Sequence, residues 1–327
     1  MKLNIQSADI SIIVQGAITL ITKNCLELLR KVFPDSEIIL STWANSSADG
    51  LNADKIIFSA DPGAAIVDKV AGTFNNVNRQ LISTQAGLKA ATRSYILKTR
   101  TDILFENADF LAYFGKYDTI NSPYFENRLL ICNYYTRNPR VFSACFHPSD
   151  WIVFGRSIDV NNYYKNIPLM TKEDETWFSY HPKKSKFFIN YICRFTPEQY
   201  IFLYFLKNYQ NVYCNSYYDR NSELIIETEK AFAQCFVVLD YQKHLLITFS
   251  KYNPNQYLEK HTLISHWQWK ALYDRYCHKK FSLRWIAYRC RGIILNLFFY
   301  IKTICIYILN YLGIKELVKS FLSQYNI

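Results

Sequence analysis

A short polar cluster follows an apolar run in residues 95–102, and its side chains could hold a charged ligand. The run begins at Tyr95 and ends with Lys98, Arg100 and Asp102. A buried strand of this pattern delivers charged side chains to the edge of a sheet, where open α/β sheets bind ligands. Asp102 could hold a divalent metal ion that in turn binds a diphosphate, and Lys98 could contact phosphate directly. A lone Asp after one strand could equally cap the next turn, so this hypothesis depends on the neighbouring strands.

Three further apolar segments in the first part of the chain end in residues suited to ligand contact. Residues 10–14, 37–40 and 55–58 are predicted to form strands. The residues that close these strands include Gln15, Gly16, Thr42, Trp43, Asp61 and Gly63. Glycine lets the backbone approach a ligand closely, and Asp61 could accept hydrogen bonds from a ribose or a base edge. Although Gly, Asp and Pro are ordinary turn residues, four such strand ends in succession predict a nucleotide-binding edge.

Helical spacing of apolar residues predicts helices between these strands, at residues 19–32 and 76–92. Arg79 lies on the second helix and could contact phosphate. Helices that alternate with wholly apolar strands are typical of a parallel sheet covered on both faces. We therefore predict an α/β fold with a Rossmann-like, mostly parallel sheet flanked by helices. The chain has neither G-x-G-x-x-G after its first strand nor G-x-x-x-x-G-K-[ST], which argues against a dinucleotide dehydrogenase and a P-loop NTPase.

The composition is that of a globular protein with a basic balance. The 327 residues are 50% hydrophobic and 20% charged, with a formal net charge of +11. This charge favours phosphate-bearing ligands, nucleic acid or an anionic membrane as partners. The basic residues concentrate beside an apolar C-terminal segment rather than among stacking aromatics, so we expect no nucleic acid partner. The nine cysteines form no C-x-x-C, and the first apolar run is too short for a signal peptide, so a cytoplasmic protein is expected.

Eight short motifs follow one another in the chain and carry a resemblance to a known family. They are IIVQG at 12–16, EIILSTW at 37–43, DPG at 61–63, NRQ at 78–80, ST with AGLK at 83–89, LKTRTD at 97–102, FHPSDW at 146–151 and PEQY at 197–200. Together, over roughly residues 10–270, they resemble the WavE family of lipopolysaccharide-synthesis proteins. The resemblance implies a glycosyltransferase of the GT-A type, which takes a sugar from a nucleotide-diphosphate donor and is associated with bacterial surface polysaccharide.

The resemblance also implies a metal site, with one departure from the usual pattern. GT-A enzymes usually carry Asp-x-Asp at the end of the strand that here gives Arg100-Thr101-Asp102. Arg100 replaces the first carboxylate and could either neutralise the diphosphate directly or pair with Asp102. We still expect a divalent cation, Mn²⁺ or Mg²⁺, on Asp102. A late His often returns to the metal in such enzymes, and His266 is the candidate, although a His buried in the core is the commoner interpretation.

Two carboxylates in the middle of the chain are candidates for a catalytic base. Asp150 lies with His147 and Trp151 on one connection, where a carboxylate and an imidazole could bond the hydroxyls of an acceptor sugar and an indole could stack on its ring. Glu198 lies in the predicted first turn of a helix, a position that the helix dipole also favours. An inverting transfer needs a carboxylate to accept the proton of the attacking hydroxyl. The sequence does not rank Asp150 and Glu198.

The C-terminal segment changes character and suggests contact with a membrane. Basic residues precede an apolar stretch at 292–314, which is long enough to span a bilayer. Lys302 near its middle would be costly inside one. Polar residues recur every seven positions and draw one stripe along a helix; they are Arg289, Asn296, Thr303 and Asn310. We expect an amphipathic helix that binds an anionic membrane surface through residues 279–320, ahead of a helix packed in the core or one that spans.

These interpretations give one leading function and one alternative. Residues 1–278 would form a GT-A-like catalytic domain, with a nucleotide-sugar half at 1–104 and an acceptor half at 105–278, and residues 279–327 a membrane-associating segment. The leading function is a hexosyltransferase-like enzyme that extends a lipopolysaccharide or capsular acceptor, saccharide or lipid-linked, at the inner face of the cytoplasmic membrane. The alternative, kept open by the missing first Asp, is a non-catalytic carbohydrate- or lipid-binding scaffold of a polysaccharide assembly complex.

Overall fold

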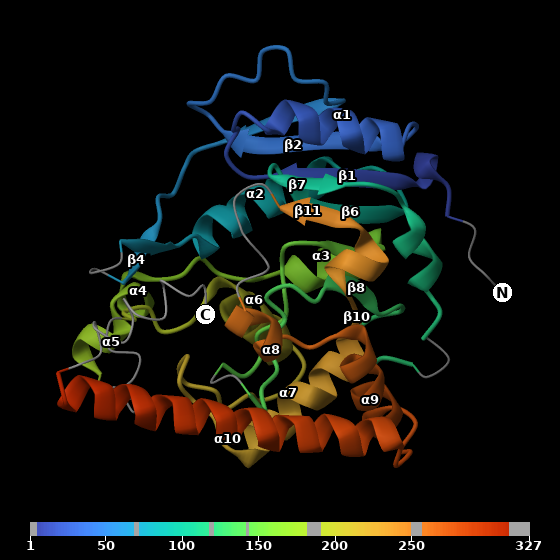
Figure 1. Ribbon diagram of the computed structural model, residues 1–327. Helices are drawn as coiled ribbons and strands as arrows, with labels where there is room; N and C mark the ends of the chain where they lie inside the picture. The colour runs from blue at the N-terminus through green and yellow to red at the C-terminus, as the bar shows by residue number, and fades with distance from the viewer. Residues whose placement is uncertain are drawn as a thin grey trace, which may run out of the picture.

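The computed structural model describes residues 5–68, 72–117, 121–141, 144–181, 191–249 and 257–313. A seven-stranded sheet in the order β10-β8-β9-β6-β1-β2-β3 forms the centre of the molecule and is flanked by helices (Figure 1). Its strands are β1 (Ile10–Gln15), β2 (Glu37–Trp43), β3 (Lys55–Ser59), β6 (Tyr95–Arg100), β8 (Leu129–Cys132), β9 (Val153–Arg156) and β10 (Phe236–Leu239). All except β9 run parallel, which confirms the predicted mostly parallel sheet.

The central strands are buried on both faces, as their apolar sequences predict. Both β1 and β2 are buried at every position, which is typical of parallel strands covered by helices on each side. Strand β1 lies between β2 and β6, with Ile13 opposite both Ile39 and Lys98. Strand β3 is at the edge of the sheet and is only partly buried.

Strand β9 brings a second set of side chains to the carboxyl edge of the parallel strands. It runs antiparallel to both β6 and β8, and Val153 at its start pairs with Lys98 and Ile131. An antiparallel strand begins at the edge where its parallel neighbours end. The residues just before β9, among them Asp150 and Trp151, therefore lie at the same edge as the residues that follow β6.

The two helices predicted in the first part of the chain are present as α1 (Thr22–Val32) and α2 (Val77–Ala90). Helix α2 packs across β1, β2 and β3. Its approach to the sheet requires a glycine, because a Cβ atom on Gly87 would lie 2.4 Å from Ile13 Cγ2. This close packing fixes the helix over the strands whose ends face the candidate site.

The later helices cover the other half of the sheet. They are α3 (Ser157–Tyr164), α4 (Lys172–Glu175), α5 (Trp177–Tyr180), α6 (Pro197–Lys207), α7 (Ser222–Cys235), α8 (Tyr257–Thr262) and α9 (His266–Tyr276). The short helical turns are η1 (Ser7–Asp9), η2 (Asp109–Tyr113) and η3 (Tyr241–Leu245). One small sheet consists of β4 (Ala65–Asp68) and β5 (Thr73–Asn75). A second small sheet consists of β7 (Ile103–Phe105) and β11 (Ile247–Phe249). Helix α3 packs on β9, and α7 and α9 pack on β10.

The C-terminal helix α10 (Leu283–Tyr311) lies along the base of the molecule in Figure 1, against α9. Trp285 and Tyr288 anchor it, since both are buried in the main hydrophobic core. Tyr288 also donates a hydrogen bond of 2.8 Å to Glu229 on α7, and the Arg140 side chain lies within van der Waals contact of a Cβ built on Gly292. The start of α10 is therefore an integral part of the fold.

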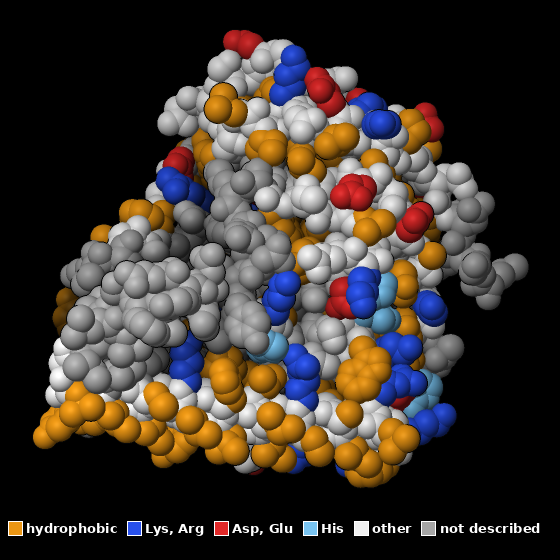
Figure 2. Space-filling view, viewed as in Figure 1, with side chains coloured by type: hydrophobic (Ala, Val, Ile, Leu, Met, Phe, Trp, Pro, Cys, Tyr) orange, Lys and Arg blue, Asp and Glu red, His pale blue; other side chains and the backbone are white. Residues whose placement is uncertain are grey.

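The outward face of α10 is apolar along its length. The exposed apolar residues on it are Ile286, Ile293, Ile294, Leu297, Phe298, Tyr300, Ile301, Ile304, Tyr307, Ile308 and Tyr311, and Figure 2 shows them as a row along the base. Asn296 of the predicted polar stripe is exposed and donates to the Arg140 carbonyl oxygen. The side chains of Thr303 and Asn310 and residues 314–320 of the expected membrane segment lie outside the described residues. None of the described helices has the length and hydropathy needed to cross a membrane.

Candidate active site

The candidate site lies where the strand order of the sheet reverses, between β1 and β6. From β1 the chain proceeds to β2 on one side, whereas β6 lies on the other, and such switch points are where open α/β sheets bind ligands. The loops that follow β1 and β6 are tied together, since Thr101 Oγ1 donates 2.8 Å to the Ala17 carbonyl oxygen. Gly16 has φ +127°, and a Cβ there would lie 3.3 Å from Thr101 Oγ1. A glycine is needed at this turn for both reasons.

Arg100 is held in one position by Asp102 and Trp151. Its Nε and Nη2 donate to the two carboxylate oxygens of Asp102 at 2.8 Å each, and its Cζ lies 4.4 Å from the centroid of the Trp151 ring. Two parallel hydrogen bonds and a cation–π contact fix both the position and the plane of a guanidinium. Of the two roles that the sequence left open for Arg100, pairing with Asp102 is the one that the structure contains.

The donor set around Asp102 does not fit a resident divalent ion. Both of its oxygens accept hydrogen bonds from Arg100, and the described ranges contain no group of three or more His, Cys, Asp or Glu side chains arranged to hold a metal. Divalent ions in proteins take several oxygen or imidazole ligands. The Mn²⁺ or Mg²⁺ expected from the resemblance therefore stays a prediction that binding measurements must test.

His266 is not brought to Asp102. It starts α9, and its Nδ1 lies 2.7 Å from the Val238 carbonyl oxygen of β10, while β10 is three strands away from β6, or roughly 14 Å at the usual strand spacing. Burial lowers the pKa of His266 to about 4, so its ring is neutral at pH 7. The ring packs between Tyr113 and Tyr117, as a core histidine does.

A buried ion pair joins β6 to the connection before β9. The Lys98 side chain is 1% exposed, its Nζ lies 3.7 Å from Asp150 Oδ2, and it also donates to the Asp150 carbonyl oxygen. Burial lowers the pKa of Lys98, and the charge of Asp150 opposes that change. Asp150 Oδ1 is also buried and has no hydrogen-bond partner among the described residues. Lys98 was predicted to contact the donor phosphate, and in the structure it points at Asp150. The second carboxylate oxygen of Asp150 can still accept a hydrogen bond.

Glu198 and His147 form a neutral contact beside this pair. Burial, followed by the charge of Asp150, raises the pKa of Glu198 to about 8, and burial with the charge of Arg137 lowers the pKa of His147 to about 3. His147 Nε2 and Glu198 Oε2 lie 3.7 Å apart, but neither group is charged at pH 7, so this contact is not an ion pair. His147 Nδ1 donates to the Tyr135 carbonyl oxygen at 3.0 Å, which leaves the lone pair of Nε2 facing Glu198.

The backbone around His147 is strained. Tyr135 and Phe146 have φ of 67° and 54°, a left-handed conformation that costs non-glycine residues about 1–3 kcal/mol and that clusters at functional sites. The Arg137 N–H donates to the His147 carbonyl oxygen at 2.9 Å, and Arg137 Cζ lies 4.8 Å from the Tyr135 ring. Tyr135 and Arg137 were not predicted as site residues. They belong to a loop without a motif, and only the fold places them beside His147.

The remaining predicted donor residues form a separate group. Arg79 Nε and Nη2 donate 2.7 Å hydrogen bonds to Asp61, Asp61 also accepts from the Gly63 N–H at 2.9 Å, and the hydrogen bonds from Arg79 lower the pKa of Asp61. Gln15 accepts from Ser83 on α2 at 2.6 Å. Thr42 and Trp43 are 0% and 6% exposed. These residues therefore stabilise one another and the ends of β1 and β2.

Comparison with protein-family models identifies a family for this chain. A family model described as WavE lipopolysaccharide synthesis matches residues 10–298, a range that includes every candidate site residue and about half of α10. No match was found among curated proteins.

Proposed function

Because the chain belongs to the WavE lipopolysaccharide synthesis family, we propose that it serves lipopolysaccharide synthesis as a glycosyltransferase that takes a sugar from a nucleotide-diphosphate donor. The observation that carries the proposal is the convergence at the β1–β6 switch point. Arg100, fixed by Asp102 and Trp151, lies at the same edge as two buried carboxyl groups, those of Asp150 and Glu198. This arrangement supplies a cation for a diphosphate and a carboxylate for a hydroxyl within one site.

In the proposed reaction Arg100 stabilises the leaving nucleotide diphosphate. As the bond to the anomeric carbon breaks, negative charge develops on the departing phosphate oxygen, and a preoriented cation in a poorly hydrated site stabilises that charge strongly. Asp102 then acts as a positioning residue, since it holds the guanidinium plane through two hydrogen bonds. Trp151 covers one face of the guanidinium and limits its access to water.

Of the two candidate bases, Asp150 is the one that fits a neutral pH. With a pKa of about 8, Glu198 holds its proton at pH 7 and cannot accept another. Asp150 is paired with Lys98 through Oδ2, and its Oδ1 has no hydrogen-bond partner among the described residues. In the proposed step Oδ1 accepts the proton of the acceptor hydroxyl as that oxygen attacks the anomeric carbon.

Donor binding tests the proposal directly. We would titrate the purified protein with UDP-, GDP-, TDP- and CMP-sugars, with and without Mn²⁺, by calorimetry, and follow donor hydrolysis. One donor should bind to the wild type, and Arg100→Gln should weaken it by about tenfold or more. Arg100→Lys is the matched control, because it keeps the charge and removes the planar fork.

Each outcome of this titration has a separate meaning. Metal-dependent binding that is lost in Asp102→Ala would show that Asp102 releases Arg100 and binds a divalent ion when the donor binds. Metal-independent binding that needs Arg100 would show that the guanidinium alone serves the diphosphate. Absence of binding to every donor would refute the transferase and favour the non-catalytic scaffold.

We also propose that α10 attaches the protein to an anionic membrane, at the inner face of the cytoplasmic membrane. Its outward face carries many exposed apolar side chains along the base of the molecule (Figure 2), and Arg289 near its start is exposed. An apolar helix face with basic neighbours is suited to the interface of an anionic bilayer. The apolar face fits lipid acyl chains, and Arg289 fits an acidic headgroup.

Sedimentation with lipid vesicles tests this attachment. Vesicles that contain phosphatidylglycerol should sediment the protein, neutral vesicles should sediment less of it, and Leu297→Ser with Ile301→Ser should reduce binding. Ile158→Ser is the control, because Ile158 is 59% exposed on a different helix. Equal binding of the wild type and the α10 variant would refute the attachment.

A further inference from the structure

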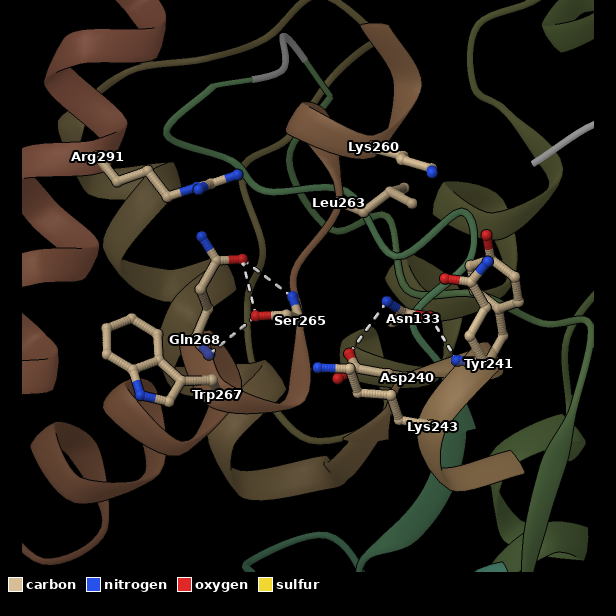
Figure 3. Close-up of a pocket in the computed structure, with 11 residues that line it drawn as sticks. Asn133, Asp240, Tyr241, Lys243, Lys260, Leu263, Ser265, Trp267, Gln268 and Arg291 are labelled. Carbon is tan, nitrogen blue, oxygen red and sulfur yellow. Dashed lines mark hydrogen bonds between the residues drawn. The ribbon is translucent and has the colours of Figure 1, made fainter. Parts of the chain in front are cut away.

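A pocket of about 350 Å³ opens beyond the ends of β8 and β10, beside the candidate active site. Asn133 directly follows β8 and Asp240 directly follows β10. The other walls come from η3, α8, the first turn of α9 and α10 (Figure 3). The carboxyl ends of β8 and β10 lie at the same edge of the sheet as that of β6, so the pocket and Arg100 belong to one side of the molecule.

Three cations from three elements line this pocket. Lys243 comes from η3, Lys260 from α8 and Arg291 from α10, and no ion pair with an acidic side chain is recorded for any of them within the described ranges. Figure 3 shows Arg291 reaching from α10 toward the space beside Gln268. The Arg291 Nη2 lies 3.5 Å from His261 Nδ1, a neighbour that does not neutralise its charge. Cations from separate elements repel one another, and a bound anion would relieve that repulsion.

The single carboxylate among the lining residues is already occupied. Asp240 Oδ1 accepts hydrogen bonds from Asn133 Nδ2 at 3.1 Å and from the His266 N–H at 2.8 Å. Its role is to tie the ends of β8 and β10 to the start of α9. Because the lining contains three cationic side chains and one carboxylate, the pocket has an excess of positive charge.

The pocket also has the parts of a saccharide site. Trp267 is 46% exposed and presents an indole that can stack on the apolar face of a sugar ring. Asn133 and Gln268 add amide groups to the lining. Asn133 already donates to Asp240 and accepts from the Tyr241 N–H, and Gln268 Oε1 accepts from the Ser265 N–H. Their remaining amide hydrogens and oxygen lone pairs can bond sugar hydroxyls. A phosphate-only site would need no such aromatic surface.

A chain of aromatic rings connects this pocket to the candidate active site. Tyr241 in the pocket wall lies 5.6 Å from Tyr134, and Tyr134 lies 5.1 Å from Trp151, ring centroid to ring centroid. Trp151 in turn covers Arg100. Two ring-to-ring contacts therefore lie between the pocket wall and the ring that covers Arg100, the proposed ligand of the donor phosphate. A saccharide chain is long enough to extend from the pocket to that donor.

We propose that this pocket binds a phosphate ester carried by the acceptor saccharide, and thereby selects phosphorylated acceptors. The inference rests on the proposed transferase function, because only a transferase has an acceptor. The binding of a phosphorylated sugar can nevertheless be measured whether or not the protein is a transferase. Lys260 and Arg291 bind the phosphate, and Trp267 stacks on the sugar that carries it.

The test uses glucose 6-phosphate as the probe, with glucose and inorganic phosphate as comparisons, in calorimetric titrations of the full chain at low salt. Glucose 6-phosphate should bind more tightly than either comparison. Lys260→Gln and Arg291→Gln should each weaken it by about tenfold, and Trp267→Ala should weaken glucose 6-phosphate but not inorganic phosphate. Lys165→Gln, at an exposed lysine after α3, is the control that should change nothing.

Five outcomes would separate this inference from its competitors. Absence of glucose 6-phosphate binding would overturn it, whatever the nucleotide-sugar titration gives. Inorganic phosphate that binds as tightly as glucose 6-phosphate would overturn the saccharide part. Vesicle binding that needs Lys260 and Arg291, without any glucose 6-phosphate binding, would assign the pocket to a lipid headgroup instead. Glucose 6-phosphate binding without donor binding would support the phosphate pocket and refute the transferase function. Unchanged donor binding in Lys260→Gln would show that the pocket and the donor site are distinct.

Discussion

The raised pKa of Glu198 makes the stability of this protein depend on pH in a definite direction. Burial and the charge of Asp150 raise that pKa from 4.5 to about 8. Between these values the unfolded chain releases the proton while the folded chain keeps it, so the folded state binds more protons and the free energy of unfolding falls as the pH rises. At about 1.36 kcal/mol per pH unit, the loss between pH 4.5 and pH 7 is about 3 kcal/mol. It is complete above pH 8, where both states are ionised.

Glu198→Gln removes this titration while keeping the size of the side chain. Urea unfolding at pH 5, 6, 7 and 8 should show the variant gaining stability relative to the wild type by up to about 1.4 kcal/mol for each pH unit. Glu223→Gln is the matched control, because Glu223 also lies in the first turn of a helix but is exposed, and its difference from the wild type should not follow this trend. A pH-independent difference for Glu198→Gln would mean that Glu198 is ionised throughout, and the reasoning would be refuted.

The same variant separates the two candidate bases. If Asp150 is the base, Glu198→Gln keeps most of the activity at pH 7, whereas Asp150→Asn lowers kcat by about 10²–10⁴-fold. If Glu198 were the base, the rate would instead rise about tenfold per pH unit up to pH 8, and Glu198→Gln would abolish it. That second result would overturn the assignment of Asp150.

Three further substitutions test the packing on which the site depends. Lys98→Met leaves Asp150 buried without its cation and should destabilise the fold by about 3–5 kcal/mol, whereas adding Asp150→Asn to it should recover much of that loss in urea unfolding. Gly87→Ala places a methyl group 2.4 Å from Ile13 Cγ2 and should cost about 1–3 kcal/mol, measured as a lower thermal midpoint; an unchanged midpoint would show that α2 can move away from the sheet. Glu229→Gln weakens the contacts of a fully buried carboxylate with Arg140 and should detach α10, which limited proteolysis would detect as faster cleavage near residue 283.

The strands β1, β2, β3 and β6 of the central sheet could be predicted because each contains an apolar run, whereas the short strands β4, β5 and β7 were not predicted. Residues 10–14 and 37–40 lie in the most buried part of the sheet, where apolar sequence and strand structure coincide. Strand β9 was harder, since its short apolar sequence does not indicate in which direction the strand runs. Its antiparallel course depends on pairing with β6 and β8, which are distant in the sequence. Yet this direction is what places Asp150 and Trp151 beside Arg100.

The candidate residues could be found from their types, but their partners could not. Asp61 and Arg79 were each predicted to contact the donor, and the structure pairs them with each other across 18 positions of sequence. Lys98 and Asp150 pair across 52 positions. Whether these charged side chains face a ligand or each other depends on how helix α2, the loop after β3 and the connection before β9 pack against the sheet. Local sequence does not contain this information.

Arg100 shows how one substitution alters the chemistry of a whole strand end. With a carboxylate at that position, Asp102 would have a second negative charge nearby, and the two could share a divalent ion. With Arg100 there, Asp102 is neutralised within the protein by two hydrogen bonds of 2.8 Å, and the cation that a diphosphate needs is supplied by the chain itself. In the proposed mechanism Asp102 keeps the Arg100 guanidinium oriented while that guanidinium binds the diphosphate. A lysine has no planar fork that Asp102 could hold in this way. For this reason Arg100→Lys, which preserves the charge and loses the fork, is the substitution that decides whether geometry or charge binds the donor.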